Sequence, residues 1–420
     1  MAKKKEDSTG LPAQPVINIG MVGHVDHGKT TLLERLSGKW TDTHSEELKR
    51  GITIRLGYAD VTFRKCEKCE GAKAYTTKEE CPHCNSKTVP LRKVSFVDAP
   101  GHESLMATML SGATIMDGAL LLVAASEKCP QPQTREHLQA LEIIGIKHVI
   151  IIQNKIDLVS EEQAMLNYQQ IKDFVKGTSY ENAPIIPISA QHRVGLDFLM
   201  QAINENIPIP ARDHNREPVM PVARSFDINK PGITWDKLVG GVLGGSLKQG
   251  ALKTGDIIEI RPGKSVVEKN QQIWKPLTTK IVSLISGGNS LESVGPGGSI
   301  GVLTSLDPSV VKSDQLTGSL VGLPGKLPKI WTELILDVHL LKRVVGTAEE
   351  LNVDPIKMSE PLMLNVNSAA TVGMVIELRK NKIRCKLKLP VCAEIGSRVT
   401  ISRRIGNRFR LIGYGTIVEK

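Results

Sequence analysis

Residues Gly23–Thr31 read GHVDHGKTT, and this stretch decides which fold the chain can adopt. The apolar run Val16–Val22 before it and the helical spacing of leucines after it predict a strand, a loop and a helix. The two glycines of G-x-x-x-x-G-K-T let backbone N–H groups surround a polyphosphate, and the helix start adds its positive dipole end. We therefore predict a phosphate-binding loop, in which Lys29 reaches the β- and γ-phosphates and the Thr30 hydroxyl binds Mg²⁺. A chance glycine-rich turn is the alternative that this context disfavours.

From residue 16 to about residue 207, strand and helix patterns alternate, as a mostly parallel sheet requires. Four further polar stretches complete a pattern at the strand ends, where open α/β sheets bind ligands. They are Arg50–Ile54 (RGITI), Asp98–His102 (DAPGH), Asn154–Asp157 (NKID) and Ser189–Gln191 (SAQ).

Each stretch offers a group that a guanine nucleotide needs. Asp98 can hold Mg²⁺ through water, Thr53 can supply a second hydroxyl ligand, and the Gly101 N–H can meet a γ-phosphate. The Asp157 carboxylate can accept two N–H bonds from guanine, and the Ala190 N–H can meet the guanine O6. The predicted GTP contacts are Asp26, His27, Gly28, Lys29, Thr30, Thr31, Gly101, Asn154, Lys155, Asp157, Ser189, Ala190 and Gln191.

The overall composition limits the class of protein. The chain has 420 residues, a formal charge of +10 and a pI near 9.1. This balance favours an acidic partner such as nucleic acid, although a well-solvated surface also explains it. No apolar run reaches the roughly 18–20 residues that span a bilayer, and the N-terminus lacks the apolar stretch of a signal peptide. Seven cysteines, mostly in CxxC pairs, argue against a disulfide framework, so we expect a cytoplasmic protein.

Four of the cysteines lie in an insertion between the RGITI and DAPGH stretches. The pairs Cys66/Cys69 and Cys81/Cys84 fit a tetrahedral zinc site in a compact knuckle. His83 could replace one cysteine, although the middle residue of such a turn more often points away. Two redox or disulfide pairs are the alternative interpretation. Cys129, Cys385 and Cys392 are scattered, and we interpret them as small apolar residues.

Taken together, these motifs resemble those of the translational GTPases, and Met116–Leu138 is similar to the elongation factor that carries aminoacyl-tRNA. The resemblance implies that His102 orients the attacking water, where other GTPases use a glutamine. It implies slow hydrolysis until a partner activates it, because no arginine is obviously placed as a finger in cis. Asp26 and the Gly51 carbonyl could hold a second Mg²⁺.

The cysteine knuckle narrows the resemblance. The ordinary elongation factor has no knuckle between its two switch segments, which correspond here to Arg50–Ile54 and Asp98–His102. The gamma subunit of archaeal and eukaryotic translation initiation factor 2 has one. That family implies a GTP-dependent carrier of methionylated initiator tRNA to the small ribosomal subunit, in a heterotrimer with an alpha and a beta subunit. Two rivals are a specialised elongation factor of the selenocysteinyl-tRNA type and an RNA-binding adaptor with GTP as a structural ligand.

Beyond residue 207 helical periodicity gives way to short strands between Gly and Pro turns, which is typical of β-barrels. We expect an α/β P-loop GTPase domain followed by two β-barrel domains. The expected boundaries are a disordered tail at 1–15, a GTP-binding domain at 16–208 with the knuckle at 64–90, and barrels at 209–327 and 328–420.

The last segment is the most basic, with 16 Lys and Arg against 9 Asp and Glu from residue 328 onward. Cations occupy every second position at Lys380, Lys382, Arg384, Lys386 and Lys388, with mostly apolar residues between them. In a strand this spacing places five cations on one face, which we interpret as a contact for tRNA phosphates. A solvated face that blocks edge pairing is the alternative.

Overall fold

The computed structural model of the chain describes residues 10–40, 56–101, 106–230, 232–268, 271–344, 351–406 and 408–419. These residues divide into two compact units, one ending at Pro210 and the other beginning at Ala211. Within them, no helix is long and apolar enough to cross a membrane.

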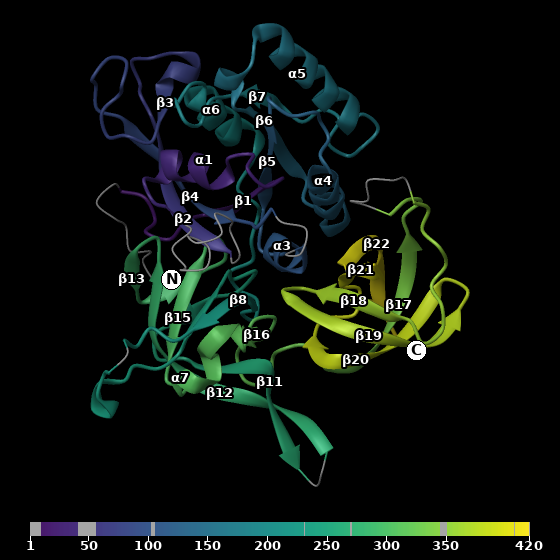
Figure 1. Cartoon of the computed structure of the whole chain (residues 1–420). Helices are drawn as coiled ribbons and strands as arrows, with labels where there is room; N and C mark the ends of the chain where they lie inside the picture. The colour runs from purple at the N-terminus through teal and green to yellow at the C-terminus, as the bar shows by residue number, and fades with distance from the viewer. Residues whose placement is uncertain are drawn as a thin grey trace. The chain divides into compact units, whose positions relative to one another are not determined.

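The first unit is built on a seven-stranded sheet in the order β3-β2-β4-β1-β5-β6-β7 (Figure 1). The strands are β1 (Ile17–Gly23), β2 (Gly57–Lys65), β3 (Tyr75–Thr76), β4 (Val89–Asp98), β5 (Gly118–Ala124), β6 (His148–Asn154) and β7 (Ile185–Pro187). β4, β1, β5, β6 and β7 run parallel, and β2 and β3 are antiparallel additions at one edge. β7 is the opposite edge strand, as its proline predicts.

Helices connect the parallel strands. They are α1 (Lys29–Ser37), α3 (Met106–Ala113), α4 (Pro132–Ile144), α5 (Glu161–Val175) and α6 (Leu196–Asn206), with short 3₁₀ turns η1 (Gly71–Ala74) and η3 (Ile156–Leu158). Leucines of α1 and apolar residues of α6 pack with β1, β4 and β6 into one buried core. α4 packs against β1 and β5. A capping box at Ser160 begins α5, and Gly145 in a left-handed conformation ends α4.

The residues expected as a tail are partly described. Residues 1–9 lie outside the described part of the chain, but Ala13 is buried and its carbonyl accepts a hydrogen bond from Lys93 Nζ at 3.1 Å. Ala13 therefore contacts the sheet through Lys93 of β4.

The second unit contains two closed β-barrels, as the sequence predicts, and each is a ring of six strands. In the first ring β11 pairs with both β16 and β12, which closes the order β11-β16-β8-β9-β15-β12. Its strands are β8 (Met220–Phe226), β9 (Val242–Gly245), β11 (Ile257–Glu268), β12 (Gln271–Ser286), β15 (Ile300–Thr304) and β16 (Leu320–Gly322). Accessory elements are η4 (Trp235–Lys237), β10 (Leu252–Lys253), β13 (Asn289–Leu291), β14 (Ser293–Val294), α7 (Pro308–Val311) and η5 (Lys312–Asp314).

The second ring has the order β17-β20-β19-β18-β21-β22. Its strands are β17 (Ile330–Leu340), β18 (Pro361–Val366), β19 (Ala369–Arg379), β20 (Lys382–Cys392), β21 (Arg398–Ile405) and β22 (Arg408–Val418). A core of apolar side chains from all six strands fills it. The two barrels meet at Leu320, Leu327 and Cys392, which form a small buried cluster.

Candidate functional site

The phosphate-binding loop joins β1 to α1. Gly23 has a φ of 140°, and Gly28 caps α1 with a φ of 87°. A Cβ atom at Gly23 would lie 2.5 Å from the Leu122 carbonyl oxygen, and one at Gly28 would lie 2.4 Å from Asn154 Nδ2. Both positions therefore need glycine for backbone conformation and for space.

The Lys29 ammonium lies inside the curl of this loop. Its Nζ donates hydrogen bonds to the carbonyls of Gly23 at 3.0 Å and His24 at 2.7 Å. A Cβ atom at Gly101 would lie only 2.5 Å from the same Nζ. The fold thus brings together two groups that the sequence assigns to phosphate, although one follows β1 and the other follows β4.

A possible Mg²⁺ position lies beside Thr30. Its hydroxyl donates a 2.8 Å hydrogen bond to Asp98 Oδ2, and Asp98 is fully buried at the end of β4. A hydroxyl and a carboxylate are the hard oxygen ligands that Mg²⁺ requires, so these residues fit the ion. Asp26 is exposed in the loop with a φ of 61°. The remaining predicted groups, Gly51, Thr53 and His102, lie outside the described residues.

Asn154 connects the phosphate loop to the Ser189–Gln191 stretch, which the sequence assigns to the base. Its Nδ2 donates to the His27 carbonyl at 2.9 Å, and its Oδ1 accepts from the Ala190 N–H at 3.0 Å. The Ala190 N–H, which we predicted to meet guanine, therefore has a protein partner in this structure. Asp157 lies in η3, which follows Lys155, and the φ of Lys155 is 64°.

Two contacts at the same edge were not predicted. Asp157 Oδ2 lies 3.6 Å from Nε2 of the exposed His192, and the Gln191 side chain accepts a 3.3 Å hydrogen bond from Arg35. The Ser189 hydroxyl accepts from the backbone N–H of His192 at 3.2 Å.

The His27 ring is fully buried, and both of its nitrogens have neighbours within the protein. Its Nδ1 lies 2.8 Å from the Leu122 carbonyl, and its Nε2 lies 3.3 Å from Glu127. Burial lowers the pKa of His27, and because a carbonyl can only accept, Nδ1 carries a proton and donates to Leu122.

Sequence reasoning also missed His137 on α4, whose Nδ1 accepts a 2.8 Å hydrogen bond from the Gly23 N–H. The available signal was a histidine on the apolar face of a predicted helix, a pattern that more often marks a core residue.

The four insertion cysteines come together, as predicted. Their Sγ atoms all lie within 4.8 Å of one another, and the closest pairs are 3.4, 3.6 and 3.7 Å apart. Tetrahedral zinc with Zn–S bonds of about 2.3 Å places its sulfurs about 3.8 Å apart, so the cluster fits this ion. Hydrogen bonds from Ser86 lower the pKa of the Cys84 thiol to about 6, whereas the hydrogen bond to Cys84 raises the pKa of the Cys69 thiol to about 12, so a bound cation is needed to hold all four sulfurs as thiolates. His83 is exposed and outside the cluster.

Two protein-family models match this chain, one over the nucleotide-binding unit and one over the last barrel. Residues 14–209 match the model of the elongation factor Tu GTP binding domain, and residues 332–417 match that of initiation factor eIF2 gamma, C terminal. Translation initiation factor 2 subunit gamma of Methanocaldococcus jannaschii is 61% identical over 99% of this chain and 100% of its own length. The same subunit of Pyrococcus furiosus is 60% identical over 97% of this chain and 98% of its own length.

The chain belongs to the family of translation initiation factor 2 gamma subunits.

As a member of this family it is a translational GTPase that uses GTP, GDP and Mg²⁺. Two solved structures share its fold. A bacterial selenocysteine-specific elongation factor aligns with a TM-score of 0.70 and 24% identity, covering 96% of this chain and 58% of that one. Elongation factor SelB of Methanococcus maripaludis, in complex with the GTP analogue GppNHp, has a TM-score of 0.69 and 23% identity, covering 96% and 79%. Such low identity shows the fold alone, so the selenocysteine alternative is not favoured over the initiation factor family.

The basic strand of this gamma subunit corresponds to β20, but with one correction. Lys380 does not belong to its cationic face, because β20 begins at Lys382 and Lys380 lies in the preceding turn with a φ of 39°. From Lys382 to Lys388 the alternation holds, with Ile383, Cys385 and Leu387 buried between the cations.

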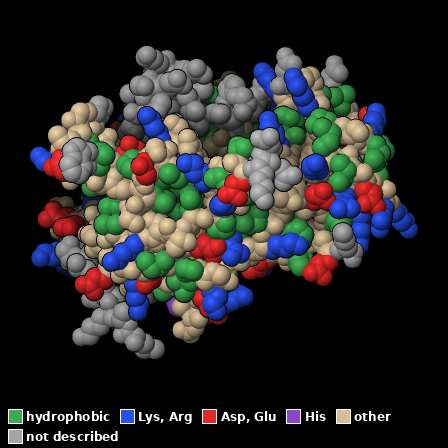
Figure 2. Space-filling model, turned by 90° about the horizontal axis from the view of Figure 1, so that it is seen from below, with side chains coloured by type: hydrophobic (Ala, Val, Ile, Leu, Met, Phe, Trp, Pro, Cys, Tyr) green, Lys and Arg blue, Asp and Glu red, His purple; other side chains and the backbone are tan. Residues whose placement is uncertain are grey.

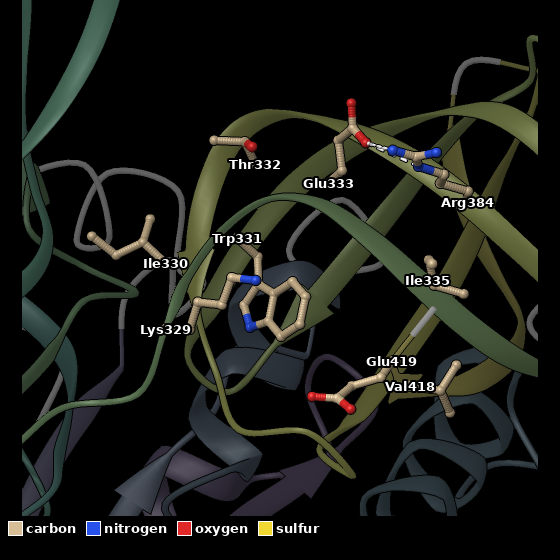
Figure 3. Close-up of a pocket in the computed structure, with 9 residues that line it drawn as sticks. All are labelled: Lys329, Ile330, Trp331, Thr332, Glu333, Ile335, Arg384, Val418 and Glu419. Carbon is tan, nitrogen blue, oxygen red and sulfur yellow. Dashed lines mark hydrogen bonds and ion pairs between the residues drawn. The ribbon is translucent and has the colours of Figure 1, made fainter.

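Arg384 differs from its neighbours on the strand. Its Nε and Nη2 both donate to Glu333 Oε2, at 2.9 and 2.6 Å, and its Nη1 lies 3.9 Å from Glu377. Figure 3 shows this pair at the rim of a cavity of about 540 Å³, where the Lys329 ammonium lies 4.4 Å from the centre of the Trp331 ring. Acidic side chains thus offset the charge of Arg384, so the expected contact with tRNA phosphates is not needed to balance this residue.

Acidic residues also accompany basic ones elsewhere. The face in Figure 2 shows Lys and Arg side chains interspersed with Asp and Glu. Among the described residues, Lys382, Lys386 and Lys388 form no ion pair. These three lysines are the part of β20 that remains available to an anionic partner.

Proposed function

We propose that this gamma subunit binds methionylated initiator tRNA in its GTP state and carries it to the small ribosomal subunit. What carries the proposal is the match to initiation factor gamma subunits over nearly the whole chain, together with phosphate-binding and base-reading stretches that lie at one edge of one sheet. Hydrolysis then relaxes the switch segments 50–54 and 98–102 and lowers the affinity for tRNA.

We assign the nucleotide contacts to side chains and backbone groups whose positions support these roles. Lys29 binds the β- and γ-phosphates from its place beside the Gly23 and His24 carbonyls, while backbone N–H groups from Asp26 to Thr31 surround the phosphates. Asp157 accepts the guanine N–H groups, and Asn154 holds the phosphate loop against the Ser189–Gln191 stretch.

Metal and hydrolysis are assigned to adjacent residues. Thr30, Thr53 and Asp98 would hold Mg²⁺, and Asp26 with the Gly51 carbonyl would hold a second ion. Bound Mg²⁺ supplies positive charge that neutralises the phosphate oxygens. His102 orients the attacking water. GTP hydrolysis stays slow until a partner of this chain activates it.

The remaining assignments concern the other parts of the chain. Cys66, Cys69, Cys81 and Cys84 hold a structural zinc ion. Residues 16–208, 209–327 and 328–420 act as the three domains, and the chain works with alpha and beta subunits in the cytoplasm. Lys382, Lys386 and Lys388 contact tRNA phosphates; Lys380 and Arg384 have a smaller role in that contact.

The tRNA that co-purifies with the chain tests this function. We expect sequencing of the bound RNA to find initiator tRNA enriched over elongator tRNAs when GTP is kept in the buffers, and this enrichment to fall with GDP. Selenocysteine tRNA in the bound fraction, or RNA without any tRNA preference, would contradict the proposal.

A further inference from the structure

His137 lies on α4 directly behind the phosphate loop, and the function proposed above gives it no role. It is 1% exposed, and its Nδ1 accepts a 2.8 Å hydrogen bond from the Gly23 N–H. These residues are 114 positions apart in the sequence, so the bond ties α4 to the first residue of the loop.

The ring keeps this acceptor at physiological pH. Burial, with further effects from Lys29, His24 and His27, lowers the pKa of His137 to about 3. A neutral imidazole carries one N–H, so accepting at Nδ1 places the proton on Nε2. The ring therefore stays neutral near neutral pH, and Nδ1 keeps the lone pair that accepts the Gly23 N–H.

Gly23 is the residue in the loop that most needs such a partner. Glycine allows wide rotation of its backbone, and the φ of 140° is one that other residues rarely adopt. Its N–H is held by His137, and its carbonyl accepts Lys29 Nζ at 3.0 Å. Rotation of Gly23 would move that carbonyl away from the ammonium.

We propose that His137 is a positioning residue of the GTPase, which fixes Gly23 so that the loop carbonyls keep Lys29 aimed at the β- and γ-phosphates. The inference rests on the proposed phosphate-binding role of Lys29. Lys29 makes more of its contacts with the triphosphate, so His137 supports GTP binding more than GDP binding.

Two matched polar variants separate this role from packing. His137→Asn places an oxygen where Nδ1 was, because both atoms are the same number of bonds from Cα, whereas His137→Gln places its acceptor one bond further out. We expect His137→Gln to weaken GTP binding about tenfold, because it leaves the buried Gly23 N–H unpaired. His137→Asn should stay within about threefold of the parent chain. Equal losses in the two variants, with similar thermal unfolding temperatures, would overturn the proposal.

A double-mutant cycle with Lys29 tests whether the effect of His137→Gln on GTP binding depends on the Lys29 ammonium. Lys29→Ala should weaken GTP binding strongly, and adding His137→Gln in that background should cost less than about twofold more. If His137→Gln costs the same factor with and without Lys29, His137 does not act through the ammonium, and only this inference fails. If Lys29→Ala leaves GTP affinity unchanged, the proposed nucleotide site itself is wrong. Isothermal titration with GTP and GDP measures each case.

Discussion

Asn154 and Thr30 show how single hydrogen bonds assemble the nucleotide site from distant parts of the chain. Asn154 holds the phosphate loop and the Ser189–Gln191 stretch with its two amide atoms, and Thr30 holds Asp98 at the end of β4. The sequence predicts that these residues meet at one edge of the sheet, because parallel strands end there. It does not predict which groups pair with one another before a nucleotide arrives, because that depends on side-chain geometry set by the packed loops.

The base-reading carboxylate gives a prediction at this scale. Asp157→Asn should weaken GTP binding about 10- to 100-fold, because an amide N–H replaces an acceptor of the guanine N–H groups. The same variant should gain affinity for xanthosine triphosphate, whose base carries a carbonyl in place of the guanine amino group. Competition binding with the two nucleotides measures both changes. Unchanged GTP affinity would show that Asn154–Asp157 does not read the base.

A second residue-scale prediction concerns hydrolysis. His102→Ala should leave GTP affinity near that of the parent chain and lower stimulated turnover about 10²-fold or more, the usual effect of losing a group that positions water or moves its proton. Phosphate release in the presence of small ribosomal subunits measures this. Weaker GTP binding with normal turnover would instead indicate a structural histidine.

At the scale of elements, local pattern and long-range pairing differ in what the sequence reveals. The alternation of basic and mostly apolar residues predicts the strand β20. The start of β20 was missed because the every-second-residue spacing of the cations continues through the turn before the strand. The extended backbone of the strand does not continue there, since Lys380 has a φ of 39°. Arg384 was misjudged because its partner Glu333 lies on another strand, 51 residues away.

The zinc knuckle gives an element-scale prediction. Elemental analysis should find one zinc per chain, and replacing Cys66 and Cys69 with serine should release it. The insertion should then become sensitive to protease, because few apolar residues lie between residues 65 and 90 and the ion must supply most of its order. GTP binding should largely survive. A protein with free thiols, no metal and a protease-resistant insertion would contradict the zinc assignment.

The basic strand β20 gives a second prediction at the scale of elements. Reversing Lys386 and Lys388 to glutamate should weaken tRNA binding most at low salt. It should also flatten the plot of log affinity against log salt by about 0.7–0.9 for each phosphate that β20 no longer binds. The preference for initiator over elongator tRNA should persist, because phosphate contacts position rather than specify.

Two controls make the test of β20 specific. Reversing the exposed Lys172 and Lys176, at the end of α5, makes the same change in net charge on the other unit and should leave the salt dependence unchanged. Arg384→Gln should have less effect than the Lys386/Lys388 reversal, because Glu333 already offsets its charge. An unchanged salt slope in the Lys386/Lys388 variant would identify a solvated strand face.

At the scale of the whole molecule, the order of motifs predicts an α/β GTPase domain followed by two β-barrels, and the structure has this architecture. Closure of each barrel depends on pairings such as β17 with β22, between strands that are distant in the sequence, which residue propensity alone does not specify. Function at this scale depends on whether the nucleotide state controls the affinity for tRNA, which is a coupling between sites.

The affinity for methionylated initiator tRNA, measured by filter binding with GTP and with GDP, tests this coupling most directly. We expect binding at least about tenfold tighter with GTP than with GDP, and tighter than for an elongator tRNA carrying the same methionine. Equal affinity in the two nucleotide states, or for the two tRNAs, would contradict it.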